Sequence, residues 1–555
     1  MAERVVLVGY GPVGARFVEE LLPAVRAGLV LLTVVGAEAA EAYNRVLVAE
    51  YAVGEADRES LEVTDAEEAR EAGVRILTGI PVVQLQRSRR TVLLGSGEQL
   101  PYDRLVLATG ARAQLPTLDG ISRRATNLRP PDDGSALDQA GPALPVGVTV
   151  LRDLDDADRL GEAVRAGSRI VVLGAGVLGM ELALAAARAG AEACVVFHGA
   201  GPMERNLDRG GSAVLARGAR QSGVALVAHA RAESILLRTG DDGVPRFDAL
   251  LCADGKQISG DLLVISCGVL PRIELAGIAG LPVSRGILVD PQLRSWGDPD
   301  VYAIGDCAHV AQRPPVGAAA SIPSGGPLGL IGTGWRQAEW LARRLHRELA
   351  GAAHPADDAV ADESSGVIQL KAETVDVVAA GQVSAEPWDD DEAGDGGRGD
   401  DGCADGRRSI AQWADPSHGR YVKMITRAGV LEGFVSVGMP RTAAELTLLF
   451  QRGSELPADR SVLLRYDGPD YDPSDTAGSL APTATVCWCN GVKVEQVTAA
   501  AEAGSETVAD IGRATRAGTG CGGCKTRIGE ILETLRPHQG SGSSGTVSPV
   551  SPLPG

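Results

Sequence analysis

Gly9-Tyr10-Gly11-Pro12-Val13-Gly14 is a glycine-rich turn near the start of the chain. The apolar run from Arg4 to Val8 before it reads as a buried strand, and Ala15 to Leu22 after it reads as a helix. In a strand, glycine turn and helix of this order, the first two glycines let the backbone turn and approach a pyrophosphate, and the third lets the helix pack on the strand. Because a helix N-terminus favours phosphate charge, the stretch predicts a dinucleotide-binding unit.

An acidic residue follows the next apolar strand, which we expect from Leu29 to Val35. Glu38 lies about 24 residues past Gly14, where a ribose-binding acid is expected in such units. The alternative for Glu38 is a solvated loop glutamate.

The same arrangement recurs later in the chain. Ile170 to Leu173 reads as a strand and leads into Gly174-Ala175-Gly176-Val177-Leu178-Gly179-Met180-Glu181 and an alanine-rich helix to Ala189. Two such turns imply two nucleotides. The following strand, Ala193 to Phe197, ends at Phe197-His198, where an NAD enzyme often has an acid and an NADP enzyme a nearby arginine. Neither is clearly present, so the residues favour NADH without deciding the coenzyme.

Four cysteines near the end of the chain form a CxC…CxxC set, Cys487, Cys489, Cys521 and Cys524. Thiolates at this spacing usually hold a metal, and the spacing leaves open either a zinc ion or an iron-sulfur cluster. A nicotinamide gives up two electrons as hydride, whereas an iron-sulfur cluster accepts one at a time, and a flavin converts between them. A flavoprotein region before the cysteines in the chain therefore favours an iron-sulfur cluster over a zinc ion.

Composition narrows the class of protein. The length of 555 residues predicts roughly three to four domains, and a net charge of −19 argues against nucleic acid and fits docking onto a basic partner. Nine cysteines are too few for a disulfide scaffold and suit a reducing compartment. The first residues lack the pattern of a signal peptide, and no apolar run reaches the length of a membrane span. We expect a cytoplasmic protein without a membrane partner.

Two further segments carry a family resemblance. Tyr102 to Ala111, with Thr109-Gly110, and Val301 to Ala308, with Gly305-Asp306, resemble the ATG and GD motifs of flavoproteins with two dinucleotide domains. Residues 1 to about 345 thus resemble a pyridine-nucleotide-disulfide-oxidoreductase-type flavoprotein, of the branch without the disulfide, since the first 350 residues contain no CxxC or CxxxxC pair. The resemblance implies FAD at the first glycine turn, NAD(P)H at the second, and an Asp306 contact with the flavin's ribityl-phosphate region. A helix N-cap is the structural alternative for Asp306.

Three shorter segments extend the resemblance. Ala42-Tyr43-Asn44-Arg45-Val46 is similar to the (P/A)YDR segment beside FAD, which implies an FAD contact for Arg45. The MERxLD-like run from Met203 to Asp208 resembles the flavoprotein part of assimilatory NADH nitrite reductase large subunits, and its Arg205 would touch a nucleotide phosphate or form a surface salt bridge. Trp335, in the segment that caps the flavin in relatives, would lie near the ring or in the core.

The last folded segment, residues 483–536, resembles the bacterioferritin-associated-ferredoxin-like 2Fe-2S domain, including its AGTGCxxC run. The resemblance implies a 2Fe-2S cluster on the four cysteines named above.

The expected fold class is α/β, with two Rossmann-like domains, a small α+β domain and a small helical iron-sulfur domain. We expect the FAD domain at 1–145 and 265–345, with the NAD(P) domain inserted at 146–264. An acidic, glycine-rich composition predicts a flexible insertion at 385–408 within an α+β domain at 366–470, and the tail at 539–555 is predicted to be disordered.

The function that these expectations favour is electron transfer. After the CxC…CxxC set is used, no CxxxxxC…CxxxC set for siroheme and a 4Fe-4S cluster remains in these residues. The resemblance then implies an electron-transfer subunit that serves a molybdenum-containing assimilatory nitrate reductase. The alternatives are a reductase for a separate nitrite reductase or another acceptor, and a flavin-bound redox sensor or cluster-delivery module.

Overall fold

The computed structural model describes residues 2–121, 144–313, 323–352, 359–360, 366–372, 375–388, 408–468, 482, 484–487, 490–519 and 524–535. The chain forms two compact units, Met1–Asp475 and Thr476–Gly555, and each is described by itself. The expected tail, most of the acidic insertion, Cys489 and Cys521 lie outside the described residues.

A parallel core of strands begins the first unit. Residues Val5 to Val8 of its first strand are all buried, as expected for a parallel strand covered on both faces. The eight-stranded sheet has the order β21-β18-β19-β20-β7-β1-β2-β3, and β1 pairs in parallel with β2 and β7. Its strands are β1 Glu3–Val8, β2 Val30–Val35, β3 Arg75–Leu77, β7 Arg104–Leu107, β18 Ile287–Val289, β19 Arg294–Ser295, β20 Asp298–Ala303 and β21 Ala308–Val310.

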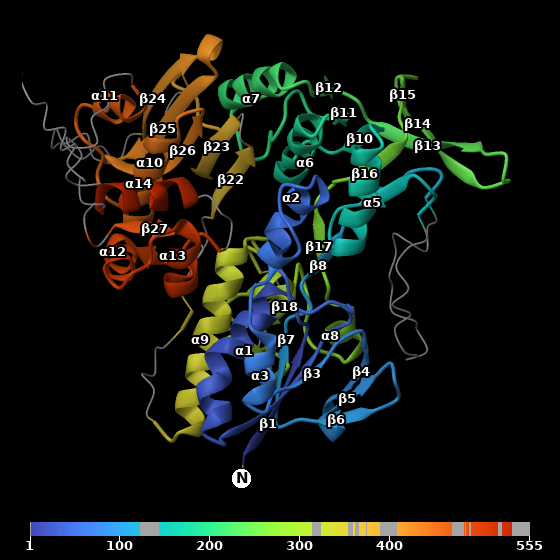
Figure 1. The fold of residues 1–555 in the computed structure, drawn as a ribbon, viewed down its shortest axis with the longest axis vertical. Helices are drawn as coiled ribbons and strands as arrows, with labels where there is room; N and C mark the ends of the chain where they lie inside the picture. The colour runs from blue at the N-terminus through green and yellow to red at the C-terminus, as the bar shows by residue number, and fades with distance from the viewer. Residues whose placement is uncertain are drawn as a thin grey trace, which may run out of the picture. The chain divides into compact units, whose positions relative to one another are not determined.

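Helices α1 (Pro12–Arg26) and α9 (Ile331–Leu349) lie against each other beside this sheet (Figure 1). Trp335 of α9 is buried and donates a hydrogen bond to the Pro12 carbonyl, 3.1 Å away. The smaller elements of this part are α2 Val48–Ala52, α3 Ala66–Glu71, β4 Val82–Gln86, β5 Thr91–Leu94, β6 Gln99–Pro101 and α8 Glu274–Ile278.

The second sheet is built from the chain between β8 (Ala111–Ala113) and β17 (Val269–Pro271), which pair with each other. Because the chain leaves and returns through this pair, the second dinucleotide-type sheet is an insertion in the first, as expected. Its order is β12-β11-β10-β16-β9, with an antiparallel β13-β14-β15 sheet as an extension. The elements are β9 Val148–Val150, α5 Leu154–Arg165, β10 Arg169–Leu173, α6 Val177–Arg188, β11 Glu192–Val196, α7 Arg209–Gln221, β12 Ala225–Val227, β13 Ala232–Thr239, β14 Pro245–Cys252, β15 Gln257–Ser259 and β16 Leu262–Ile265.

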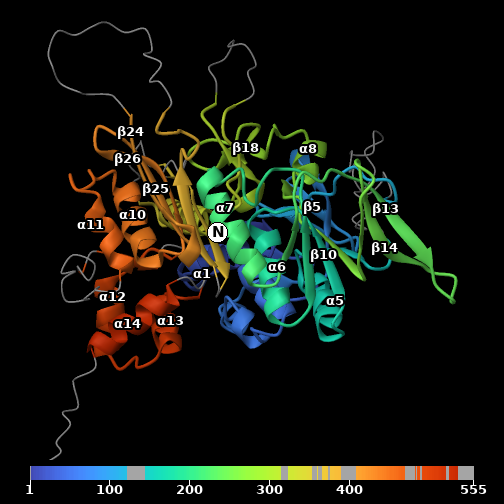
Figure 2. The same ribbon diagram turned by 90° about the horizontal axis from the view of Figure 1, so that it is seen from above.

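A third, antiparallel sheet has the order β22-β23-β26-β25-β24 and packs on helices from its own segment. Figure 2 shows α7 between this sheet and the second one. The elements are β22 Val367–Ala372, β23 Val375–Gly381, β24 Arg408–Asp415, β25 Arg420–Arg427, β26 Val430–Val437, α10 Pro440–Arg452 and α11 Ser461–Leu464.

Close packing of α7 on the third sheet depends on glycine. A Cβ added at Gly210 would lie 2.6 Å from the Tyr421 ring, and one at Gly211 would lie 2.7 Å from Val435. The same junction contains a fully buried lysine, Lys423, whose Nζ lies 3.1 Å from Oδ2 of the buried Asp208. The Tyr421 hydroxyl also donates to this carboxylate, so the buried charges are paired and hydrogen-bonded.

The second unit is small and mostly helical. Its elements are β27 Thr485–Cys487, β28 Val492–Lys493, α12 Val494–Glu502, α13 Val508–Thr515 and α14 Lys525–Leu535. Val497, Ile511 and Ile528 are fully buried at its centre. None of the helices in the described parts of the chain combines the length and the apolar character that a membrane span requires.

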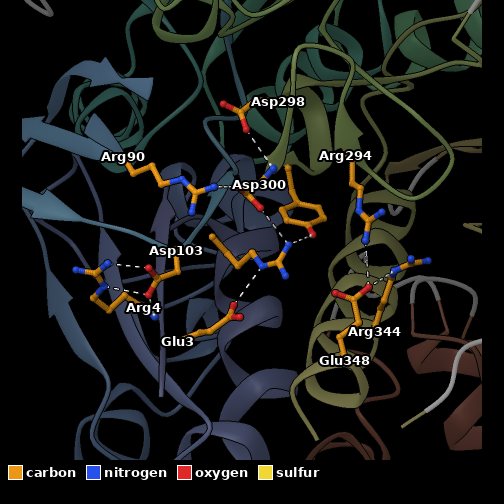
Figure 3. Close-up of polar contacts among 11 residues, drawn as sticks. Glu3, Arg4, Arg90, Asp103, Arg294, Asp298, Asp300, Arg344 and Glu348 are labelled. Atoms are coloured by element: carbon orange, nitrogen blue, oxygen red, sulfur yellow. Dashed lines mark hydrogen bonds and ion pairs between the residues drawn. The ribbon is translucent and has the colours of Figure 1, made fainter. Parts of the chain in front are cut away.

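Ion pairs line the amino ends of the strands in the first sheet (Figure 3). Arg4 of β1 points toward Asp103, with Nη2 2.7 Å from Oδ1, and this hydrogen bond lowers the pKa of Asp103 to about 2. Nη1 of Arg104 lies 3.3 Å from Oδ1 of Asp300 in β20. These paired charges lie at the amino ends of the strands, whereas the glycine turn follows the carboxyl end of β1.

Candidate functional site: two nucleotide turns and a pair of thiols

The first glycine turn lies at the carboxyl end of β1, between strand and helix. Gly9 has φ +114°, and a Cβ there would lie 2.1 Å from the Ala108 carbonyl oxygen. A Cβ at Gly14 would lie 2.2 Å from the Gly9 carbonyl oxygen, so both positions require glycine for close packing. Gly11 differs, because its nearest neighbour would be Nε of Arg45 at 3.8 Å. The turn thus has two tight glycines and an open one, which is the form that a pyrophosphate needs.

Glu38 and Arg45, predicted separately, meet beside this turn. Arg45 forms an ion pair with Glu38, and the Tyr43 hydroxyl donates to the Glu38 carboxylate at 2.8 Å. Burial opposes ionisation of Glu38, but Arg45 and Tyr43 outweigh it and hold its pKa below the ordinary value. Glu38 is therefore a carboxylate, able to accept hydrogen bonds from ribose hydroxyls.

Three further predicted residues, Thr109, Gly110 and Asp306, follow strands of the first sheet at the same end. Thr109 follows β7 and donates its hydroxyl proton to the Arg272 carbonyl at 2.8 Å. Gly110 has φ +66° and accepts a hydrogen bond from the Arg272 backbone NH. Asp306 follows β20 inside a short 3₁₀ turn whose N-cap is Ile304, so the alternative of a helix N-cap does not describe it. Instead, its carboxylate lies 3.1 Å from Nη2 of Arg152.

Arg152, which sequence reasoning missed, joins these groups. Its Nε donates to the Ala111 carbonyl at 3.2 Å, and its own carbonyl accepts from Nη1 of Arg45 at 3.0 Å. The capping box of α5, Asp153 and Asp156, fixes this backbone, since the Arg152 NH donates to Asp156 at 2.9 Å. Its only signal in the sequence is its position before a capping box. The network brings an open glycine, a carboxylate and two arginines together beside the first turn, and these residues fit FAD.

The second glycine turn repeats the geometry of the first. Cβ atoms at Gly174 and Gly179 would lie 2.2 Å from the Ser266 oxygen and 2.1 Å from the Gly174 oxygen, whereas one at Gly176 would meet nothing within 4 Å. Gly176 is the N-cap of α6, and Glu181 lies in the second turn of this helix. The open glycine at a helix N-terminus fits the pyrophosphate of a nicotinamide coenzyme.

Arg205, for which a nucleotide phosphate contact or a surface salt bridge was expected, is exposed. Arg205 and Asn206 line a cavity of about 660 Å³ together with residues of the third sheet, among them Arg408, and with Phe450 of α10. His198, at the end of β11, is exposed.

In the second unit, the two ends of the cysteine motif come together. Cys487 at the end of β27 and Cys524 before α14 are both buried. A hydrogen bond with Cys524 lowers the pKa of the Cys487 thiol to about 6, against the opposing effect of burial. Asn490, which sequence reasoning did not single out, donates to the Arg516 carbonyl at 2.7 Å and lies 3.7 Å from the Cys487 sulfur. A buried pair that favours thiolate fits an iron-sulfur cluster.

Comparison with known proteins agrees with this geometry. The family model described as pyridine nucleotide-disulphide oxidoreductase matches residues 3–325. The chain belongs to this family. A second model, the BFD-like [2Fe-2S] binding domain, matches residues 485–534. The protein is therefore an NAD(P)H-dependent flavoprotein oxidoreductase of this family, with FAD and NAD(P)H as cofactors and a 2Fe-2S domain at its C-terminal side.

Relatives share the combination of both parts. The nitrite reductase [NAD(P)H] of Bacillus subtilis is 26% identical over 96% of this chain and 57% of that protein. The assimilatory nitrate reductase electron transfer subunit of the same organism is 25% identical over 96% of this chain and 60% of that protein. The chain thus spans about three fifths of the length of these relatives.

Solved structures share the fold. The covalent putidaredoxin reductase-putidaredoxin complex has a TM-score of 0.64 at 22% identity, covering 86% of this chain and 98% of that one. A NAD-dependent persulfide reductase from A. fulgidus has a TM-score of 0.61 at 25% identity, covering 81% and 77%.

Proposed function

We propose that this flavoprotein takes electrons from NAD(P)H and passes them singly, through its 2Fe-2S domain, to a separate molybdenum-containing assimilatory nitrate reductase. The observation that carries the proposal is the buried Cys487–Cys524 pair in the same chain as two glycine turns with open centres. When bound, FAD supplies the conversion of a two-electron hydride donor to single electrons, and the cluster supplies the one-electron outlet.

The chain's own residues bind and orient the two nucleotides and the cluster. Gly11 and Gly176 let backbone amides approach the two pyrophosphates, and Glu38 accepts hydrogen bonds from an adenosine ribose. Arg45 and Arg152 supply positive charge beside the first turn, and Asp306 fixes the Arg152 side chain. Cys487, Cys489, Cys521 and Cys524 hold the cluster. No group has to move a proton at a carbon centre, so positioning accounts for the site's contribution.

Nitrate reductase as the acceptor is supported by similarity along 96% of the chain to an electron transfer subunit of that enzyme. A nitrite reductase is the second candidate acceptor, because large subunits of nitrite reductases match the chain over a similar length.

The acceptor is identified by reconstitution. Purified chain and NADH are added to a purified assimilatory nitrate reductase and, separately, to a siroheme nitrite reductase, and nitrite or ammonium is measured. We expect NADH-dependent nitrate reduction that is lost with Cys524→Ser and kept with Cys403→Ser, a cysteine outside the motif. Stimulation of nitrite reduction alone would contradict the nitrate reductase proposal, and equal stimulation by the Cys524→Ser variant would contradict the cluster as the outlet.

A further inference from the structure

The adenosine end of the second nucleotide turn lacks the usual acid. In Rossmann units, an acidic residue at the end of the strand next to the glycine turn binds the ribose hydroxyls of NAD. Here that strand is β11, which pairs in parallel with β10 and is followed by Phe197, His198 and Gly199. None of these three can accept hydrogen bonds as a carboxylate does, so the sequence at this point left the coenzyme undecided.

The loop after β11 turns back over the glycine turn. The Met203 NH donates to the carbonyl of Ala175, inside the second glycine turn, at 2.8 Å. Met203 has φ +55°, a left-handed conformation that non-glycine residues rarely adopt. Its carbonyl accepts hydrogen bonds from the NH groups of Asn206 and Leu207, and Ser212 donates to the Pro202 carbonyl at 2.7 Å. The loop is therefore held in one conformation next to the turn.

This conformation brings an acid to the end of β11. A Cβ added at Gly199 would lie 2.0 Å from Oε2 of Glu204, so the carboxylate lies directly against the Gly199 backbone. Glu204 is exposed, and its carboxylate occupies the space that a side chain on residue 199 would take. The neighbouring Arg205 lines the cavity beside the third sheet. Strained backbone at Met203 and a glycine at 199 thus combine to place a carboxylate where the strand itself supplies none.

We propose that Glu204 is the specificity-determining residue for the coenzyme and selects NADH over NADPH. A carboxylate at this position accepts hydrogen bonds from the 2′ and 3′ hydroxyls of the adenosine ribose. It repels the 2′-phosphate of NADPH, which carries about −1.5 to −2 charges near pH 7. The proposal rests on the assignment of the second glycine turn to NAD(P)H.

Equilibrium binding tests the proposal without electron transfer. ADP-ribose and 2′-phospho-ADP-ribose are titrated calorimetrically into the purified, flavin-loaded full chain. We expect the wild type to bind ADP-ribose more tightly, and Glu204→Gln to weaken ADP-ribose binding about tenfold, since a hydrogen bond to a charged group is lost. Glu204→Arg should reverse the preference. Glu192→Gln, which removes the same charge at the other end of β11, is the matched control and should change neither affinity.

A second variant tests the geometry. Gly199→Ala places a methyl group where the Glu204 carboxylate lies, so it should lower the preference for ADP-ribose in the wild-type background and have no further effect in Glu204→Gln. Rates of flavin reduction by NADH and NADPH, measured by stopped flow, should change in the same direction as the affinities.

Two results would overturn the inference. An unchanged ratio of the two affinities in both Glu204→Gln and Glu204→Arg would show that this carboxylate does not face the ribose, even with a functional coenzyme site. Failure of the wild type to bind either ligand would remove the coenzyme assignment itself and the inference with it.

Discussion

Each nucleotide turn contains an open glycine and tightly packed glycines, and substitutions at the two kinds of position should have opposite effects. The second turn shows the contrast best, at Gly176 and Gly179. Gly176 has φ −74° and ψ −178°, an extended conformation that any residue adopts, and a Cβ there would meet nothing within 4 Å. Gly176→Val therefore fills space that the protein leaves empty. The cost to stability should be about 1 kcal/mol or less, from replacing glycine by a poorer N-cap residue.

Gly179 is the matched control in the same turn. A Cβ there would lie 2.1 Å from the Gly174 carbonyl oxygen, roughly 1.2 Å closer than carbon and oxygen ordinarily approach. Gly179→Val should therefore force the helix away from the strand and cost about 3 kcal/mol or more, as overpacking does.

The assay combines three measurements on each variant: FAD content, thermal unfolding, and the rate of flavin bleaching by NADH in stopped flow. Gly176→Val should keep FAD and its unfolding temperature and lose flavin reduction by about a hundredfold or more, which corresponds to about 2.7 kcal/mol of coenzyme binding. Gly179→Val should unfold at lower temperature. Normal flavin bleaching by a correctly folded Gly176→Val variant would show that the open glycine does not face the coenzyme.

Three other predictions concern stability and flavin retention. Arg152→Met removes the cation paired with Asp306 and should speed loss of FAD on dilution about tenfold or more, measured by flavin fluorescence, without a comparable fall in unfolding temperature. Burial raises the pKa of Glu19 to about 7. The folded state therefore favours the neutral carboxyl group, and this contribution to the free energy of unfolding is present at pH values below the ordinary pKa of glutamate and is lost as the pH rises through 7. Glu19→Gln should therefore stabilise the protein by on the order of 1–3 kcal/mol at pH 8 and by little at pH 4, and an equal effect at both would contradict this. Lys423→Met leaves the buried Asp208 without its cation and should cost about 3–5 kcal/mol in urea unfolding, more than the double variant Lys423→Met/Asp208→Asn.

The elements that carry nucleotide contacts could be predicted from local sequence because their signals are local. The expected strand from Arg4 to Val8 is β1, which begins one residue earlier, and the helix expected from Ala15 to Leu22 lies within α1. Gly210, Gly211 and Gly218 lower the helix propensity of α7, so its local sequence does not indicate a helix. It forms because those glycines let it pack closely on the third sheet, and no local pattern shows that packing.

Contacts between distant residues account for the rest of the site. Arg152 and Asp306 are far apart in sequence, and nothing in either segment indicates that they pair. Glu204 and Arg205 belong to the same MERxLD-like run, and only the turn at Met203 shows that Glu204 is the one that reaches the end of β11. Roles of single residues thus required the three-dimensional structure even where the family resemblance was visible.

If electrons leave the protein through the 2Fe-2S cluster, NADH must reduce that cluster by way of the flavin. Protein purified anaerobically is assayed for iron, sulfide and zinc, then mixed with NADH and examined by electron paramagnetic resonance. We predict roughly two irons and two sulfides per chain and a reduced-cluster signal that appears after flavin bleaching. In the Cys524→Ser variant, NADH should bleach the flavin normally, and the reduced-cluster signal should be absent. Stoichiometric zinc, or a cluster that stays oxidised while the flavin is fully reduced by NADH, would contradict the account.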